Sequence, residues 1–258
     1  MNRVESDIPI WGTEIYVEAS SSKLSEDQIK NEIAKVHDFY IEVDNQLSTY
    51  KTESAVSLIR KKKLKIEDAP EIVKEVWLGC LEAKRLSAGA FDPWAVKGGF
   101  DPSGLVKGWA ADICADMLVK VGCEHVQVNA AGDLALRGGF LDVKTGEVKP
   151  WTIGVVNPDS KMETLKSFDI TDGAIATSGD YEKGAHITDP RNSLPAIGAR
   201  SATVIGPDGG IADALATACM VDGKESNNWI GAPELAEYSF FVLNRHEKTA
   251  WGYGPLAD

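Results

Sequence analysis

An α+β fold is expected from this chain, because stretches with strand periodicity and stretches with helix periodicity follow one another along its whole length. Side chains alternate between Trp11 and Ala19, with Ile15 and Val17 on one face, as in a half-buried strand. Apolar residues then recur at helical spacing, at Ile29, Ile33, Val36 and Tyr40. The chain has 258 residues, 43% of them hydrophobic, without a repeat or long linker, so we expect one compact domain over residues 1–258.

Three helices are expected in the N-terminal half. Ser25 and Gln28 form a capping box that starts the first helix, which continues to about Leu47. Residues 53–60 predict a short second helix. Pro70 marks the start of the third helix, since proline is favoured in a first turn. The apolar stripe of this helix is expected at Val73, Val76 or Trp77, Cys80 and Ala83.

Two more helices and several strands are expected in the C-terminal half. Residues 101–104 form a turn that leads into a helix ending at Gly122. The apolar face of this helix is expected at Val106, Ala110, Ile113, Met117 and Val121. Residues 211–221 are rich in alanine and predict a helix that packs closely against other backbone. Strands are expected at 126–128, 134–136, 151–156, 201–205 and 238–243, with a loop or hairpin over 138–150.

The amino-acid composition narrows the classes of partner and the cellular location that we expect. The formal net charge of −12 repels phosphate backbones and anionic lipid, so we expect no nucleic-acid or membrane-surface binding. The basic run 60–65 is interpreted as a solvated turn. The four cysteines form no C-x-x-C pair and are expected to be buried thiols in a reducing compartment. Without a signal peptide, a lipid-accepting cysteine or a membrane-spanning segment, the chain is expected to be cytoplasmic unless a leader was removed.

Two neighbouring segments carry most of the chemically capable side chains. Residues 176–182 and 186–191 place a histidine, two hydroxyls, several carboxylates and an arginine around a glycine and a proline. Because such backbone favours turns, we expect a site here rather than a core strand. His186 is the candidate general base, since a neutral imidazole accepts a hydroxyl proton near pH 7. Asp189 and Arg191 could equally form a structural ion pair.

Asp213 and Thr217 stand four residues apart on an expected helix, which places a carboxylate and a hydroxyl on one face. Mg²⁺ prefers such hard oxygen ligands and keeps positions for substrate phosphates. The same spacing is also common on an ordinary solvated helix. The sequence pattern alone leaves both interpretations open.

Eight motifs, taken in order from about Ile10 to Tyr253, resemble the FAD:protein FMN transferase family, the ApbE-type flavin transferases. They lie at 12–13, 47–50 with 53–54, 89–93, 104–112, 128–133, 176–182, 186–191 and 213–218. The resemblance implies a T-fold-related, ApbE-like α+β architecture with a mixed or antiparallel sheet and packed helices.

The resemblance also implies an activity. Members of this family use Mg²⁺ to transfer the FMN moiety of FAD to a Thr or Ser hydroxyl of an acceptor protein, with release of AMP. This chain carries no acceptor signature such as Ser/Thr-Gly-Ala-Ser/Thr, so the acceptor is expected to be another protein. Two alternatives stay open at this point: a Mg²⁺-dependent FAD pyrophosphatase that gives FMN and AMP, and an FAD-binding protein without turnover.

By the same resemblance, the expected metal ligands are Asp213, Thr217 and the backbone oxygen of Gly104, and the expected catalytic residues are His186 and Asp213. The positions expected to bind FAD are Trp11, Tyr50, Ala90, Phe91, Asp92, Asp101, Lys107, Thr177 and Ser178. The chain departs from the family in a shortened connection over 94–100, and in Trp11, which replaces a methionine. A shorter connection would leave the ligand more exposed or differently clasped.

Overall fold

The computed structural model describes residues 1–142, 144–180, 187–247 and 249–257, with Lys161 described by its backbone only. Its main sheet has the strand order β1-β2-β3-β4-β9-β10-β11-β12, and each neighbouring pair is antiparallel. These strands are β1 (Asn2–Ile10), β2 (Thr13–Ser21), β3 (His125–Ala130), β4 (Asp133–Arg137), β9 (Gly173–Gly179), β10 (Ala199–Gly206), β11 (Ser239–Asn244) and β12 (Ala250–Tyr253). Two small antiparallel sheets pair β5 (Phe140–Leu141) with β6 (Val148–Lys149), and β7 (Trp151–Asn157) with β8 (Ser160–Ile170).

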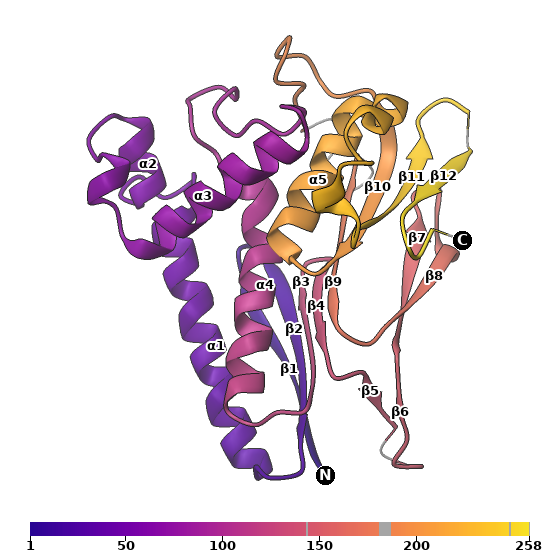
Figure 1. Ribbon diagram of the computed structural model, residues 1–258. Coiled ribbons are helices and arrows are strands. Elements are labelled where there is room, and N and C mark those ends of the chain that lie inside the picture. The colour runs from indigo at the N-terminus through magenta and orange to yellow at the C-terminus, as the bar shows by residue number, and fades with distance from the viewer. Residues whose placement is uncertain (143, 181–186, 248, 258) are drawn as a thin grey trace.

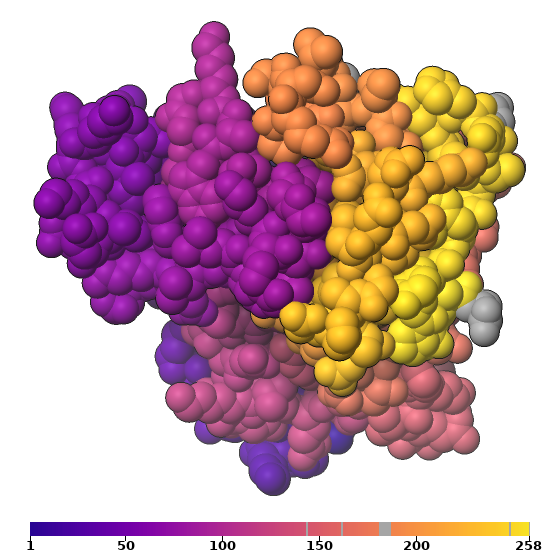
Figure 2. Space-filling model, turned by 45° about the horizontal axis from the view of Figure 1, so that its top comes forward, coloured from indigo at the N-terminus to yellow at the C-terminus, as the bar shows by residue number. Residues whose placement is uncertain are grey.

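Helices cover one face of the main sheet (Figure 1). They are α1 (Glu26–Leu47), α2 (Ala55–Arg60), α3 (Glu71–Leu86), α4 (Ser103–Lys120) and α5 (Gly209–Asp222), with short 3-10 turns at Ile66–Asp68, Gly223–Asn228 and Pro233–Leu235. Helix α4 packs on β3 and β4, and α5 packs on β9 and β10. Helix α3 lies against α5, and Figure 2 shows its purple surface bordering the orange surface around α5. The expected α+β fold is confirmed.

Helices α4 and α5 cross at very short range because both carry glycine at the contact. A Cβ atom built on Gly108 would lie 2.0 Å from the carbonyl oxygen of Gly209, and one built on Gly209 would lie 2.6 Å from that of Gly108. Only glycine therefore permits this approach of the two backbones. The small side chains of α5, such as Ala212 and Ala216, are fully buried in the same region. The expected close packing of residues 211–221 is confirmed.

Local signals located most elements. Ser25 accepts a hydrogen bond from the Gln28 N–H, and the Gln28 side chain accepts one from the Ser25 N–H, so the capping box is present. Gly122, with φ +110°, lies just after α4. All four cysteines are free and buried, as expected of reduced thiols. Among the described residues, no helix is long and apolar enough to cross a membrane.

Three expectations were wrong in detail. Strand β1 was not predicted, and Trp11 belongs to the two-residue β1–β2 turn with φ +57° rather than to a strand. The buried face of α4 passes through Cys114 and Leu118, whereas Val121 is 40% exposed. The reason is that α4 packs on α1, α5 and the sheet, so its burial does not follow one stripe. Residues 176–179 belong to the core strand β9, although turn-forming backbone was expected.

Candidate functional site

Three charged side chains from different elements meet between the helices and the sheet. The Lys107 ammonium on α4 donates to the carboxylate of Asp133, at the start of β4. The same Nζ lies 3.4 and 3.3 Å from Oδ1 and Oδ2 of Asp213 on α5. The two carboxylates are only 1% and 4% exposed, whereas the Lys107 side chain is 29% exposed. The cluster is thus a buried pair of acids whose cation reaches the surface.

The local sequence explains why these groups meet. Lys107 precedes Gly108, where α4 touches α5, and Asp213 lies one turn beyond Gly209 in α5. Asp208 caps α5, because its side chain accepts from the Ile211 N–H at 2.8 Å. Asp133 follows a tight turn between β3 and β4, and its Oδ1 accepts from the Thr177 N–H on β9 at 3.2 Å.

Burial and mutual proximity shift the pKa values of the side chains in this cluster. Burial raises the pKa of Asp213 above its usual value, and the nearby Asp133 raises it further, against the opposing effect of Lys107. Burial alone would lower the pKa of Lys107, but the Coulombic attraction of Asp133 and Asp213 outweighs it and the pKa is raised. Lys107 therefore stays charged at neutral pH, and Asp213 holds a proton more readily than an exposed aspartate does.

Two of the three expected metal ligands, Gly104 and Thr217, lie close together, and the third, Asp213, belongs to the charged cluster. Thr217 lies one turn after Asp213, and its Oγ1 is 3.2 Å from the Ser178 hydroxyl on β9. A Cβ atom on Gly104 would lie 3.3 Å from Thr217 Oγ1, so the backbone at Gly104 closely approaches that hydroxyl. Gly104, with φ −84° and ψ +15°, interrupts the helical geometry of α4.

The backbone of α4 also contributes an acceptor here. The Gly108 N–H donates to the Asp213 carboxylate. The Gly104 carbonyl, the Asp213 carboxylate and the Thr217 hydroxyl are the three oxygen groups expected as metal ligands. These three oxygen donors match the ligand chemistry of Mg²⁺, although the described residues contain no group of three or more His, Cys, Asp or Glu side chains that could hold a metal.

The expected flavin-binding positions divide into two groups. Phe91 is 4% exposed, and its ring lies 3.1 Å from a Cβ built on Gly104. Ala90 is buried next to it. Asp92 pairs with Lys84 at 2.6 Å and accepts from the Trp94 N–H at 3.0 Å. Phe91 and Ala90 thus lie beside the oxygen cluster, while Asp92 organises the loop that follows.

Three other expected positions have the following surroundings. Trp11 packs edge-on against Tyr40 at 5.2 Å. Tyr50 is 96% exposed. Asp101 accepts from the Ser103 N–H at 3.1 Å and lies 3.5 Å from Arg60, so it acts as a turn cap and an ion-pair partner.

The short 94–100 connection packs onto α3. The Trp94 ring stacks on Phe100 at 5.4 Å, and Trp77 meets both rings at 4.9 and 4.6 Å. The connection is therefore held by aromatic contacts from its two ends.

His186, the candidate base, lies outside the described residues, as do Tyr181 and Glu182. The downstream segment is anchored by charge. Arg191 pairs with Asp189 at 2.9 Å and with Asp222 at 2.9 Å, at the end of α5. The structural ion pair between Asp189 and Arg191 is confirmed.

Sequence reasoning gave no role to Asp133, although it lies inside the 128–133 motif. Only its partner Lys107, 26 residues earlier in the sequence, reveals the place of Asp133 in the cluster. Asp112 was missed as well. It accepts from the Gly209 N–H and from Arg137 Nη2 at 3.1 Å, and burial raises its pKa to about 6.

Solved structures share this fold. The flavin transferase ApbE from Vibrio cholerae superposes with a TM-score of 0.81 at 22% identity, covering 98% of this chain and 96% of that one. The ApbE protein from Thermotoga maritima gives a TM-score of 0.79 at 24% identity, covering 96% of each chain. At such identities these matches show a common architecture.

Sequence relatives agree. An FAD:protein FMN transferase from Vibrio cholerae is 35% identical over 136 residues, which are 48% of this chain and 39% of the relative. The enzyme of that name from Klebsiella pneumoniae is 31% identical over 135 residues, 48% of this chain and 37% of the relative. The match thus spans about two fifths of these relatives' length. The ApbE family model matches residues 94–238, more than half of the chain. This protein therefore belongs to the ApbE family.

Proposed function

We propose that this protein transfers the FMN moiety of FAD to a Ser or Thr hydroxyl of an acceptor protein, with Mg²⁺ as cofactor and AMP as the leaving group. The observation that carries the proposal is the contact of Lys107 with Asp213, with Thr217 one helical turn further along α5 and close to the backbone of Gly104. Sequence relatives named FAD:protein FMN transferase support the same chemistry.

A pyrophosphate needs local positive charge, because the chain as a whole carries −12. Lys107 is the cation of the cluster, and its partly exposed side chain would meet a phosphate oxygen that approaches from solvent. The Ser178 hydroxyl, 3.2 Å from Thr217, would donate to a second phosphate oxygen. A Mg²⁺ ion held by Asp213, Thr217 and the Gly104 carbonyl would supply further charge neutralisation at the diphosphate.

In the proposed transfer, one bond to phosphorus forms and one breaks. The acceptor hydroxyl oxygen forms a bond to the phosphorus of the FMN half, the bond from that phosphorus to the bridging oxygen breaks, and AMP leaves with the bridging oxygen. The hydroxyl proton passes to a base, and His186 is assigned that role on residue type and motif. Water in place of the acceptor hydroxyl would give free FMN and AMP.

The experiment compares three reactions with FAD and Mg²⁺: without an acceptor, with a small carrier protein displaying a Thr-Gly-Ala-Thr loop, and with the same carrier mutated to Ala-Gly-Ala-Ala. We expect AMP and carrier-bound flavin, the latter measured by its fluorescence, to form in equimolar amounts. This result is expected only with the carrier that has the intact loop. AMP without bound flavin would make the protein a pyrophosphatase. FAD binding with neither product would make it a flavin carrier.

Two variants test the residue roles. Asp213→Asn is expected to lower the Mg²⁺-dependent rate by roughly 100-fold or more, because it removes the anionic ligand. Asp38→Asn, on the exposed surface of α1, makes the same charge change away from the cluster and should keep the wild-type rate. His186→Ala is expected to slow transfer far more than it weakens FAD binding. A wild-type rate in Asp213→Asn would disprove the metal assignment.

A further inference from the structure

Strand β1 forms one end of the eight-stranded sheet, and within the described parts of the chain it pairs with β2 alone. It is nine residues long, whereas β12 at the opposite end has four. The N–H and C=O groups on the outer side of such a strand are a ready template for another strand. A strand of this length offers enough of them for a stable pairing.

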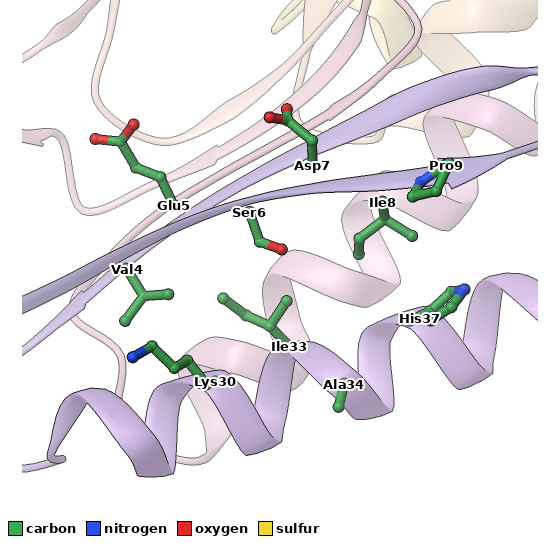
Figure 3. A pocket seen from close by; sticks show the side chains of 10 residues that line it. All are labelled: Val4, Glu5, Ser6, Asp7, Ile8, Pro9, Lys30, Ile33, Ala34 and His37. Atoms are coloured by element: carbon green, nitrogen blue, oxygen red, sulfur yellow. The ribbon is translucent and has the colours of Figure 1, made fainter.

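A groove runs between this edge and helix α1, with a volume of about 390 Å³ (Figure 3). Val4, Ser6 and Ile8 point from β1 toward the helix. Ile33 and Ala34 form the middle of the helical wall, and Lys30 and His37 lie toward the two ends. The groove is therefore lined in its middle by small and apolar side chains, with Lys30 and His37 toward its two ends.

The opposite face of the same edge is acidic. Glu5 and Asp7 point away from α1 (Figure 3). The register places Glu18 beside Glu5 and Glu14 beside Pro9 on the neighbouring strand. Arg3 pairs with Glu5 at 2.8 Å and with Glu18 at 2.9 Å, so it offsets part of this charge.

We propose that the β1 edge is a docking site for an extended segment of a partner protein, which adds to the sheet as a further strand. Side chains of a strand alternate between faces, so one set would enter the groove above α1 and the other would lie beside Glu5 and Asp7. The complementary segment has small apolar residues in the first set and Lys or Arg in the second. This docking site is independent of the flavin chemistry proposed above.

A second copy of this chain is a poor occupant. Antiparallel pairing of two β1 strands centred on Ser6 would set Glu5 of each copy opposite Asp7 of the other. Like charges directly opposite one another destabilise a strand pair. Pro9 lacks an N–H, which limits pairing at that position for any added strand, so the discrimination against a second copy rests on charge. The charge pattern therefore favours a different, basic partner.

The probe is a fluorescein-labelled nine-residue peptide of alternating Lys and Val, compared with one of alternating Glu and Val by fluorescence anisotropy. We expect the Lys peptide to bind at least 10-fold more tightly. Ala34→Trp fills the groove from an exposed position and should weaken binding at least 10-fold, whereas Lys35→Trp on the outer side of α1 should not. Asp7→Lys should also weaken it, and Glu67→Lys, the same charge change far along the chain, should have a small effect.

Hydrogen exchange supplies the geometric test. Bound Lys peptide should slow exchange of amides in β1 and leave β12 unchanged, as expected if backbone bonds form at this edge. Binding that ignores Ala34→Trp and Asp7→Lys, or that leaves β1 exchange unchanged, would overturn the proposal. So would a dimer detected by light scattering that Ala34→Trp dissociates, because the occupant would then be a second copy.

Discussion

Gly108 lies where α4 touches α5, and its replacement by alanine tests the geometry on which the candidate site depends. The added Cβ would lie 2.0 Å from the Gly209 carbonyl oxygen, whereas real Cβ atoms essentially never approach below 3.0 Å, so the helices must separate by about 1 Å. The obstacle is backbone, which cannot rotate away. Overpacking of this kind costs about 1–3 kcal/mol, and the gain in helix propensity of about 1 kcal/mol offsets only part of it.

The matched control is Gly79→Ala in helix α3. Its Cβ would meet Leu105 Cδ1 at 3.4 Å, an ordinary van der Waals contact. We therefore expect the free energy of unfolding to rise by up to about 1 kcal/mol in Gly79→Ala and to fall by up to about 2 kcal/mol in Gly108→Ala. Urea unfolding followed by circular dichroism measures both values.

The Gly108→Ala substitution should also disturb the candidate site. Lys107 precedes Gly108, so separation of the helices should lengthen the 3.3 Å contact between Lys107 and Asp213. The rate of flavin transfer should then fall in Gly108→Ala and stay at the wild-type value in Gly79→Ala. If the two variants were equally stable and active, the close helix crossing would not exist in solution.

Lys107→Met leaves Asp133 and Asp213 facing each other without a cation. The free energy of unfolding should therefore fall by about 3–5 kcal/mol at pH 8, and by less at pH 5, where one carboxyl takes a proton. An equal loss of stability at both pH values would contradict the existence of the cluster. Asp112 has a pKa raised to about 6 by burial, so folded protein holds this proton more tightly than unfolded chain. Its contribution to stability therefore falls as pH rises from about 4 to about 6, by up to about 3 kcal/mol. Carboxyl-carbon NMR should show a midpoint near 6 for this residue, and a midpoint below 4 would disprove its burial. Burial also raises the pKa of the cysteine thiols, so a thiol reagent at pH 8 should modify them only after urea unfolds the chain; rapid modification of folded protein would contradict the packing.

Elements with strong local signals were predictable. The Ser25–Gln28 capping box and the apolar spacing through Tyr40 each act within a few residues. The observed bounds of helix α1 agree with the expected ones to within one residue at each end. Strand β1 was not predictable in this way. Its residues include Glu5, Asp7 and Pro9, which suit an edge strand but resemble a loop in composition.

The candidate site was recognisable in part. Asp213, Thr217 and Gly104 were expected together from the family resemblance, and in the structure the Gly104 backbone lies close to the Thr217 hydroxyl, one helical turn after Asp213. Asp133 was not assigned, because nothing in its own neighbourhood identifies Lys107 as its partner. Trp11 and Tyr50 were expected near the flavin, and this stays a prediction; in the structure Trp11 packs against Tyr40 and Tyr50 is exposed.

Residue order alone settled the α+β character, the capped helices and the acidic charge, because each follows from spacing or composition along a short stretch. The meeting of Lys107 with Asp133 and Asp213, 26 and 106 residues away, depended on chain packing. That meeting requires two backbones to touch at Gly108 and Gly209, and removes both acids from water. Burial and proximity raise the pKa of Asp213, and both are properties of the packed molecule.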